Sequence, residues 1–131
     1  MGFIRTDKDI VPVAGGERIA AGDTVVINSS GCAEPAPAPG PGVSGTVFGV
    51  AIEDADNTAG NDGDVRVTIE FSRGQKEYLF AGSGIGLKDV TKPCYVGADP
   101  KAVSLTSEDA VLAGTISGVE ADGRVRVILP L

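Results

Sequence analysis

The densest group of potential metal ligands in the sequence is an acidic segment at residues 53–64. It contains five carboxylates and two side-chain amides: Glu53, Asp54, Asp56, Asp62 and Asp64, with Asn57 and Asn61 between them. Oxygen-rich loops of this kind can bind calcium. The EF-hand template does not fit, because a loop starting at Asp54 has Ala59 at its sixth position and Val65 at its twelfth. We therefore predict a solvated hairpin loop, with calcium binding as the alternative.

Catalytic and redox chemistry have few residues to use. The sequence contains no histidine, which removes the commonest general base and the Ser-His-Asp and Cys-His arrangements. Its two cysteines, Cys32 and Cys94, are far apart and form no metal-binding spacing. We expect two reduced thiols, with a disulfide as the alternative. We therefore predict that the protein is not an enzyme, that it uses no cofactor, and that it has no catalytic or metal-binding residues.

A glycine-rich stretch at 82–86 superficially resembles a phosphate-binding loop. The dinucleotide fingerprint requires a strand before such a loop and a helix after it. Here Pro93 closes any helix almost at once, so at most one helical turn fits between Leu87 and Lys92. We interpret the stretch as a turn.

Charge and hydropathy exclude two classes of partner. The formal net charge is −7, from 11 basic and 18 acidic residues. Binding to nucleic acid requires a basic stripe that displaces counterions from phosphates, and no stripe is visible. No apolar run approaches the roughly 20 residues that span a bilayer. We therefore expect neither a nucleic-acid nor a membrane partner.

The elements that must position any site are short strands. The chain has 131 residues, among them 19 glycines and 8 prolines, with 5% aromatics and no tryptophan. A core of valine, isoleucine, leucine and alanine, with many turn residues, is typical of a mainly β fold. The clearest strand runs from Val65 to Phe71 and alternates perfectly. We predict one buried face and one face exposed to solvent. The buried face carries Val65, Val67, Ile69 and Phe71, and the exposed face carries Arg66, Thr68 and Glu70.

The domain organisation follows from the turns. Residues 34–42 alternate proline with alanine and glycine, which favours an extended path without ladder hydrogen bonds. Because the residues before it are too few for an independent core, we interpret it as a loop rather than a linker. We predict a single β domain over 15–131, preceded at 1–14 by either an edge strand of that domain or an arm that docks elsewhere.

Two segments echo each other. Each has a glycine-containing strand, a turn ending in Asp-Gly and a strand opening Val-Arg-Val: residues 49–69 and 114–129. A hairpin explains each segment, and such hairpins can arise without duplication.

The order of these features resembles the capsid decoration, or cement, proteins of tailed bacteriophages. The resemblance rests on pattern over residues 15–131: the Gly22-Asp23 turn, the Gly-Val-Ala strand at 49–51, the acidic loop, the segment 90–96 and the final strands. It implies a β-barrel or β-tulip-like fold and a homotrimer that binds the major capsid protein on the outer surface of the virion, after synthesis in the host cytoplasm. Such a protein would stabilise the shell by bridging capsid subunits. The candidate capsid-binding residues lie in the N-terminal segment: Phe3, Ile4, Arg5, Ile10 and Val11. The alternative is a carbohydrate- or surface-binding β module of a phage tail or fibre.

Overall fold

The protein is built almost entirely of short strands. The computed structural model describes residues 7–71 and 76–130, and these form twelve strands and one 3-10 turn. We call 7–71 the N-terminal module and 76–130 the C-terminal module. The predicted fold class, mainly β with a small barrel and little helix, is confirmed.

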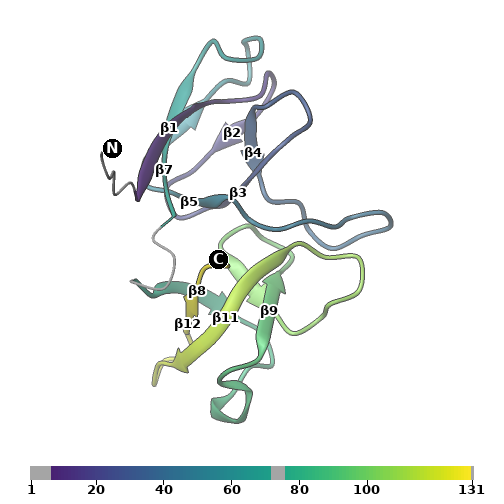
Figure 1. Cartoon of the computed structure of the whole chain (residues 1–131), viewed down its shortest axis with the longest axis vertical. Coiled ribbons are helices and arrows are strands. Elements are labelled where there is room, and N and C mark those ends of the chain that lie inside the picture. The colour runs from purple at the N-terminus through teal and green to yellow at the C-terminus, as the bar shows by residue number, and fades with distance from the viewer. Residues whose placement is uncertain (1–6, 72–75, 131) are drawn as a thin grey trace, which may run out of the picture.

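The strands of the N-terminal module are β1 (Lys8–Pro12), β2 (Arg18–Ile19), β3 (Thr24–Ile27), β4 (Ala33–Pro35), β5 (Gly49–Ala51), β6 (Ala55–Asp56) and β7 (Arg66–Glu70). The C-terminal module contains β8 (Tyr78–Gly82), the 3-10 turn η1 (Leu87–Asp89), β9 (Pro93–Val96), β10 (Ala102–Ser104), β11 (Leu112–Val119) and β12 (Val125–Ile128). The two modules lie one above the other, with the chain between β4 and β5 running along their boundary (Figure 1). The glycine-rich stretch at 82–86 leads into η1 and forms no long helix, as predicted.

Each module is a ring of five strands. In the C-terminal module β10, β8, β12, β11 and β9 close into a barrel. In the N-terminal module the sheet has the order β1-β7-β5-β3-β4. A parallel bridge between Val13 and Ala33 links its two edges, and the backbone N–H of Ala14 donates to the carbonyl of Ala33 at 2.9 Å. The small β2–β6 pair lies outside this ring.

The two rings have the same topology. In each, the first strand pairs antiparallel with the fifth, the fifth with the fourth, the fourth with the second and the second with the third. In each, the third strand meets the first in parallel, at Val13–Ala33 in one ring and between β10 and β8 in the other. The sequence echo falls on the fourth and fifth strands of both rings, so it marks equivalent elements of one repeated arrangement.

The modules share hydrophobic contacts. One buried cluster fills the N-terminal ring around Val13, Val25, Val67 and Ile69. The other fills the C-terminal barrel and also includes three N-terminal side chains, Ala36, Val47 and Val50. Ala36 lies within the proline-rich segment and Val47 lies five residues beyond its end, so this stretch of chain contributes to the C-terminal core.

The burial predicted for β7 is wrong at one position, Glu70. Val67 and Ile69 are fully buried, as the alternation predicts, but Glu70 is buried as well. The reason is that its side of the sheet meets the C-terminal module, where Glu70 accepts hydrogen bonds from Tyr78 Oη at 2.9 Å and Lys76 Nζ at 3.1 Å.

Candidate functional site

The predicted N-terminal surface is partly described. Phe3, Ile4 and Arg5 lie outside the described residues. Ile10 and Val11 lie on β1, which pairs with β7 from Lys8 opposite Glu70 to Pro12 opposite Arg66. Val11 is 9% exposed and packs in the core, whereas Ile10 is 58% exposed. Of these two candidates, only Ile10 is therefore available to a partner.

Ile10 belongs to an apolar row that crosses three neighbouring chain segments. It pairs with Thr68 on β7, and the carbonyl of Thr68 accepts the backbone N–H of Ile52 at 3.2 Å. Directly opposed residues of a sheet carry their side chains on the same face. Ile52 is 45% exposed, so two large aliphatic side chains flank Thr68 on the outer face of the N-terminal module. We call Ile10, Thr68 and Ile52 the outer row.

The edge of β1 that faces away from β7, which meets β4 only beyond Pro12, is protected against strand addition. The backbone O of Asp7 accepts from Phe71 N at 2.8 Å, and Val13 N donates to Val65 O at 2.9 Å. The backbone N–H and C=O groups of the odd-numbered residues of this strand therefore point to β7, and those of the even-numbered residues point away from it. The outward N–H of Ile10 donates to its neighbour Asp9 Oδ1 at 2.9 Å, and Pro12 has no N–H to offer. Occupied donors and proline are devices that keep an edge from pairing. A partner would meet the face at Ile10 more readily than the edge.

The acidic loop is organised by its own hydrogen bonds. All five of its carboxylates accept a backbone N–H within the N-terminal module: Glu53 from Thr68, Asp54 from Ala21, Asp56 from Thr58, Asp62 from Gly15 and Asp64 from Asn61. Hydrogen bonds from Thr68 lower the pKa of Glu53, and those from Thr58 lower the pKa of Asp56. Within the described residues no three His, Cys, Asp or Glu side chains converge in a way that could hold a metal ion. The carboxylates thus bond the loop to β7, to the turns at Gly15 and Ala21, and to itself.

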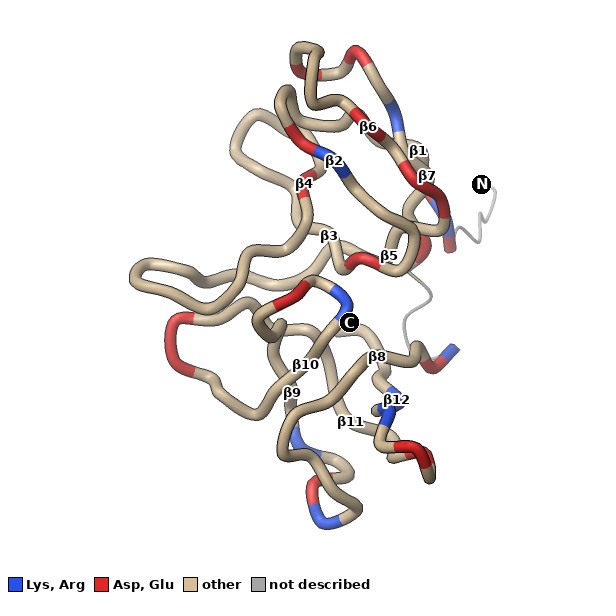
Figure 2. The backbone as a smooth tube through the Cα atoms, turned by 180° about the vertical axis from the view of Figure 1, so that it is seen from behind, with Lys and Arg blue, Asp and Glu red and all other residues tan. Residues whose placement is uncertain are grey.

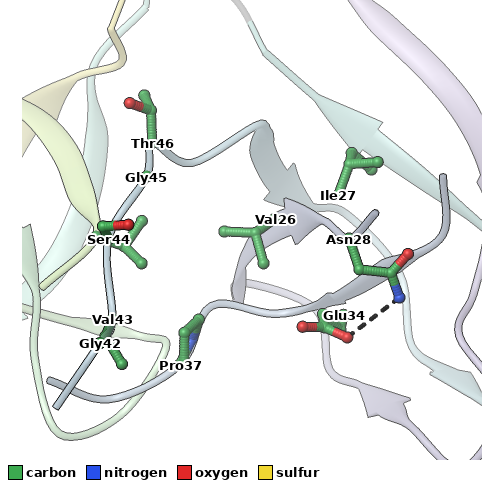
Figure 3. Close-up of a pocket in the computed structure, with 11 residues that line it drawn as sticks. Val26, Ile27, Asn28, Glu34, Pro37, Gly42, Val43, Ser44, Gly45 and Thr46 are labelled. Carbon is green, nitrogen blue, oxygen red and sulfur yellow. Dashed lines mark hydrogen bonds between the residues drawn. The ribbon is translucent and has the colours of Figure 1, made fainter. Parts of the chain in front are cut away.

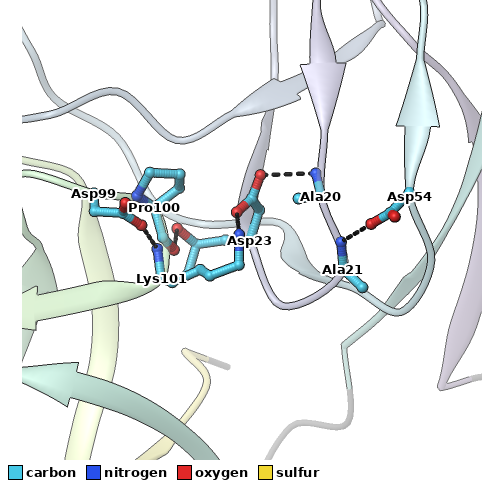
Figure 4. A network of polar contacts seen from close by, with 8 residues as sticks. Ala20, Ala21, Asp23, Asp54, Asp99, Pro100 and Lys101 are labelled. Carbon is cyan, nitrogen blue, oxygen red and sulfur yellow. Dashed lines mark hydrogen bonds and ion pairs between the residues drawn. The ribbon is translucent and has the colours of Figure 1, made fainter.

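A polar clamp that the sequence reasoning missed joins the modules. Asp23, in the turn before β3, is buried and accepts a hydrogen bond from Lys101 Nζ at 2.6 Å in the turn before β10. The same carboxylate accepts the N–H of Ala20 at 2.9 Å (Figure 4). Beside it, Thr24 donates to the carbonyl of Pro100 through both its N–H at 2.9 Å and its hydroxyl at 2.7 Å. The Gly22-Asp23 pattern predicts a turn at this position, but it does not indicate Lys101 as the partner of Asp23.

The two thiols are buried and separate. Cys32 and Cys94 are both free. Burial raises the pKa of Cys94 to about 12, which makes its thiolate a negligible species at neutral pH. Neither cysteine offers a reactive site.

The charges are distributed unevenly between the modules. The N-terminal module has 11 acidic and three basic residues, whereas the C-terminal module has seven acidic and six basic ones, and the lysines and arginines gather into no stripe (Figure 2). The arrangement resembles an ordinary solvated surface more than an electrostatic track.

An open cavity of about 400 Å³ lies at the boundary of the modules, between β3 and the chain that follows the proline-rich segment. Val26 and Glu34 point into it, and Asn28 Nδ2 donates to Glu34 Oε2 at 3.3 Å at one end (Figure 3). The opposite wall is formed by residues 42–46, and Val111 contributes from the C-terminal module. Sequence reasoning gave no signal for this cavity, because its walls come from separate stretches of chain.

Comparisons of the chain with protein-family models, curated proteins and solved structures found no match. Among the residues that the structure describes, no helix is long and apolar enough to cross a membrane.

Proposed function

We propose that this protein is a non-enzymatic decoration protein of a tailed-phage head. It binds the outer surface of the icosahedral shell as a trimer and bridges neighbouring subunits of the major capsid protein. The observation that carries the proposal is the outer row, in which Ile10 and Ile52 expose apolar area on a hydrogen-bonded sheet. A large aliphatic side chain exposed on a preformed face is the kind of anchor that protein interfaces use.

The construction of the molecule supports a binding role for this face. β1 is held by β7 along its whole length, so Ile10 is positioned without an ordering cost on binding. Because the edge of β1 is protected against strand pairing, a partner would bind through side-chain contacts with the outer row. Weak contacts of this size stabilise a shell only when many copies bind at once, because multivalent attachment multiplies their effect.

The alternative, a sugar-binding module, has less support. Sugar sites commonly use exposed aromatic rings, but the described aromatics are buried or half-buried. Phe48 and Phe71 pack on each other with ring centroids 5.5 Å apart.

The test is binding to a panel of purified, undecorated tailed-phage heads, followed by co-sedimentation and by thermal melting of the heads. Binding that raises the melting temperature of at least one head, together with a trimer mass by light scattering, would support the proposal. A monomer that sediments with no head in the panel would contradict it.

A further inference from the structure

The cavity at the module boundary has the geometry of an interrupted sheet. β3 pairs with β5 at Thr24–Val50 and Val25–Gly49, and the N–H of Phe48 donates to the carbonyl of Val25 at 2.7 Å. This last bond is shifted by one residue from those pairs, and if the ladder continued in the shifted register, Ile27 would lie opposite Thr46. No pairing between these two residues is present, and both line the cavity instead.

The peptide groups of Ile27 face the cavity side of β3. On the other side of β3, Ala36 N donates to Thr24 O and Asn28 N donates to Cys32 O, each at 2.9 Å. Even-numbered residues of β3 therefore bond with β4, and the N–H and C=O of Ile27 point the opposite way. They have no backbone partner among the described residues.

Thr46 presents the matching edge from across the cavity. Its neighbours are bonded to β11, since Leu112 N donates to Gly45 O and Val47 N donates to Leu112 O, each at 2.9 Å. Because the N–H and C=O of a trans peptide point in opposite directions, the N–H and C=O of Thr46 then face away from β11. Two strand edges with unused donors and acceptors thus border one cavity.

The side chains that line the cavity define what kind of strand would fit. Val26 and Glu34 are directly opposed on β3 and β4, and both point into the space (Figure 3). Val43 and Val111 add apolar surface, and Glu34 is the only charged residue of the lining. An apolar floor with one carboxylate complements a strand whose inward side chains are aliphatic around one basic residue.

We propose that this cavity is a binding site for an extended peptide segment with a basic side chain. The segment pairs with the free edges at Ile27 and Thr46, and its lysine or arginine bonds with the carboxylate of Glu34. The site is separate from the outer row, and its occupation does not depend on whether the protein binds a phage head.

The test uses an acetylated, amidated five-residue peptide in which valine, threonine, arginine, threonine and valine follow one another, so that both valines and the arginine share one face. Titration of the ¹⁵N-labelled protein should shift the amide signals of Ile27 and Thr46, with saturation. A peptide with glutamate in place of arginine should bind at least fivefold more weakly, which corresponds to a partly exposed ion pair of about 1 kcal/mol.

Two variants locate the charge contact. Glu34→Gln should remove the preference for arginine over glutamate, whereas Glu120→Gln, at the far end of β11, should preserve it. Because Glu34→Gln also alters the bond to Asn28, Ser44→Arg serves as a second variant that places a guanidinium at the rim and should compete with the peptide.

Three results would overturn the proposal: no shift at Ile27 or Thr46 up to the solubility limit of the peptide, equal affinity for the arginine and glutamate peptides, or equal binding by free argininamide. The last result would identify a site for small amines instead of a strand.

Discussion

Asp23 Oδ1 and Lys101 Nζ lie 2.6 Å apart and connect the two modules across 78 residues of sequence. Asp23 is 4% exposed, whereas the side chain of Lys101 is about half exposed. The buried carboxylate therefore depends on a partner that reaches it from the surface. A buried charge that loses its partner keeps its desolvation cost without compensation.

Replacement of Lys101 by methionine should therefore destabilise the fold. The ammonium is lost while the aliphatic stem is kept, and Asp23 retains only its bond to Ala20. We expect a loss of about 1–2 kcal/mol in the free energy of unfolding, discounted for the exposure of Lys101. Urea unfolding measures it. Lys88→Met is the control, because Lys88 is exposed and forms no salt bridge among the described residues; equal effects of the two variants would refute the clamp.

Substitution in the outer row should separate binding from stability. Ile10→Lys changes an exposed side chain and should alter the free energy of unfolding by no more than about 0.5 kcal/mol, while it abolishes attachment to a phage head that binds the wild-type protein. Val11→Ala, one residue away, opens space in the core and should cost about 1–3 kcal/mol without touching the outer face.

The readouts for this pair are co-sedimentation and urea unfolding. Intact head binding by Ile10→Lys would remove the outer row from the proposed interface. Deletion of residues 2–13 is a poorer test, since it takes away a strand with five paired positions and the fully buried Val13.

Gly49 should be intolerant of a side chain. A Cβ at this position would lie 2.5 Å from the carbonyl oxygen of Glu70 on the neighbouring strand, and backbone of a paired strand cannot move aside cheaply. Gly49→Ala should lower the free energy of unfolding by about 2–3 kcal/mol. Gly86→Ala is the matched control, because its φ of −129° suits any residue and a Cβ there meets nothing within 4 Å. A Gly49→Ala protein as stable as the wild type would show that the β5–β7 spacing is looser than described.

The Cys94 thiol should be inert in the folded protein. Its pKa of about 12 leaves almost no thiolate at neutral pH, and Cys32 is buried as well. A disulfide-exchange reagent such as 5,5′-dithiobis(2-nitrobenzoic acid) should label neither cysteine until denaturant is added, and then label both. Rapid labelling of the native protein would contradict the buried placement of the thiols.

Local patterns predicted local structure well, and contacts between distant segments were the part they missed. The alternation at Val67 and Ile69 predicted their burial, because a strand with one core face repeats every two residues. The same rule failed at Glu70. One face of β7 is open to solvent near Thr68, but at Glu70 the same face is covered by the C-terminal module. Asp23 was recognised only as a turn residue, because nothing near it in sequence indicates Lys101. The cavity beside Val26 was invisible for the same reason, whereas the echo of Val65–Val67 at Val125–Val127 did mark equivalent strands of two like-built rings.

Glu70 should make the junction of the modules sensitive to acid. Burial raises the pKa of Glu70, but hydrogen bonds from Lys76 and Tyr78, together with the charges of Lys76 and Lys8, outweigh it and hold the pKa below its ordinary value of 4.5. A carboxyl whose pKa is lower in the folded than in the unfolded protein contributes stability that is full above the unfolded pKa and is lost as the pH falls through the folded pKa.

Tyr78→Phe removes one of the bonds that lower the pKa of Glu70. The variant should be less stable than the wild type at neutral pH and should lose less of its stability between about pH 6 and pH 3. Urea unfolding across that range measures both effects, with Tyr95→Phe as the control for loss of a tyrosine hydroxyl; parallel pH profiles for Tyr78→Phe and the wild type would show that the Tyr78 hydroxyl does not stabilise the Glu70 carboxylate.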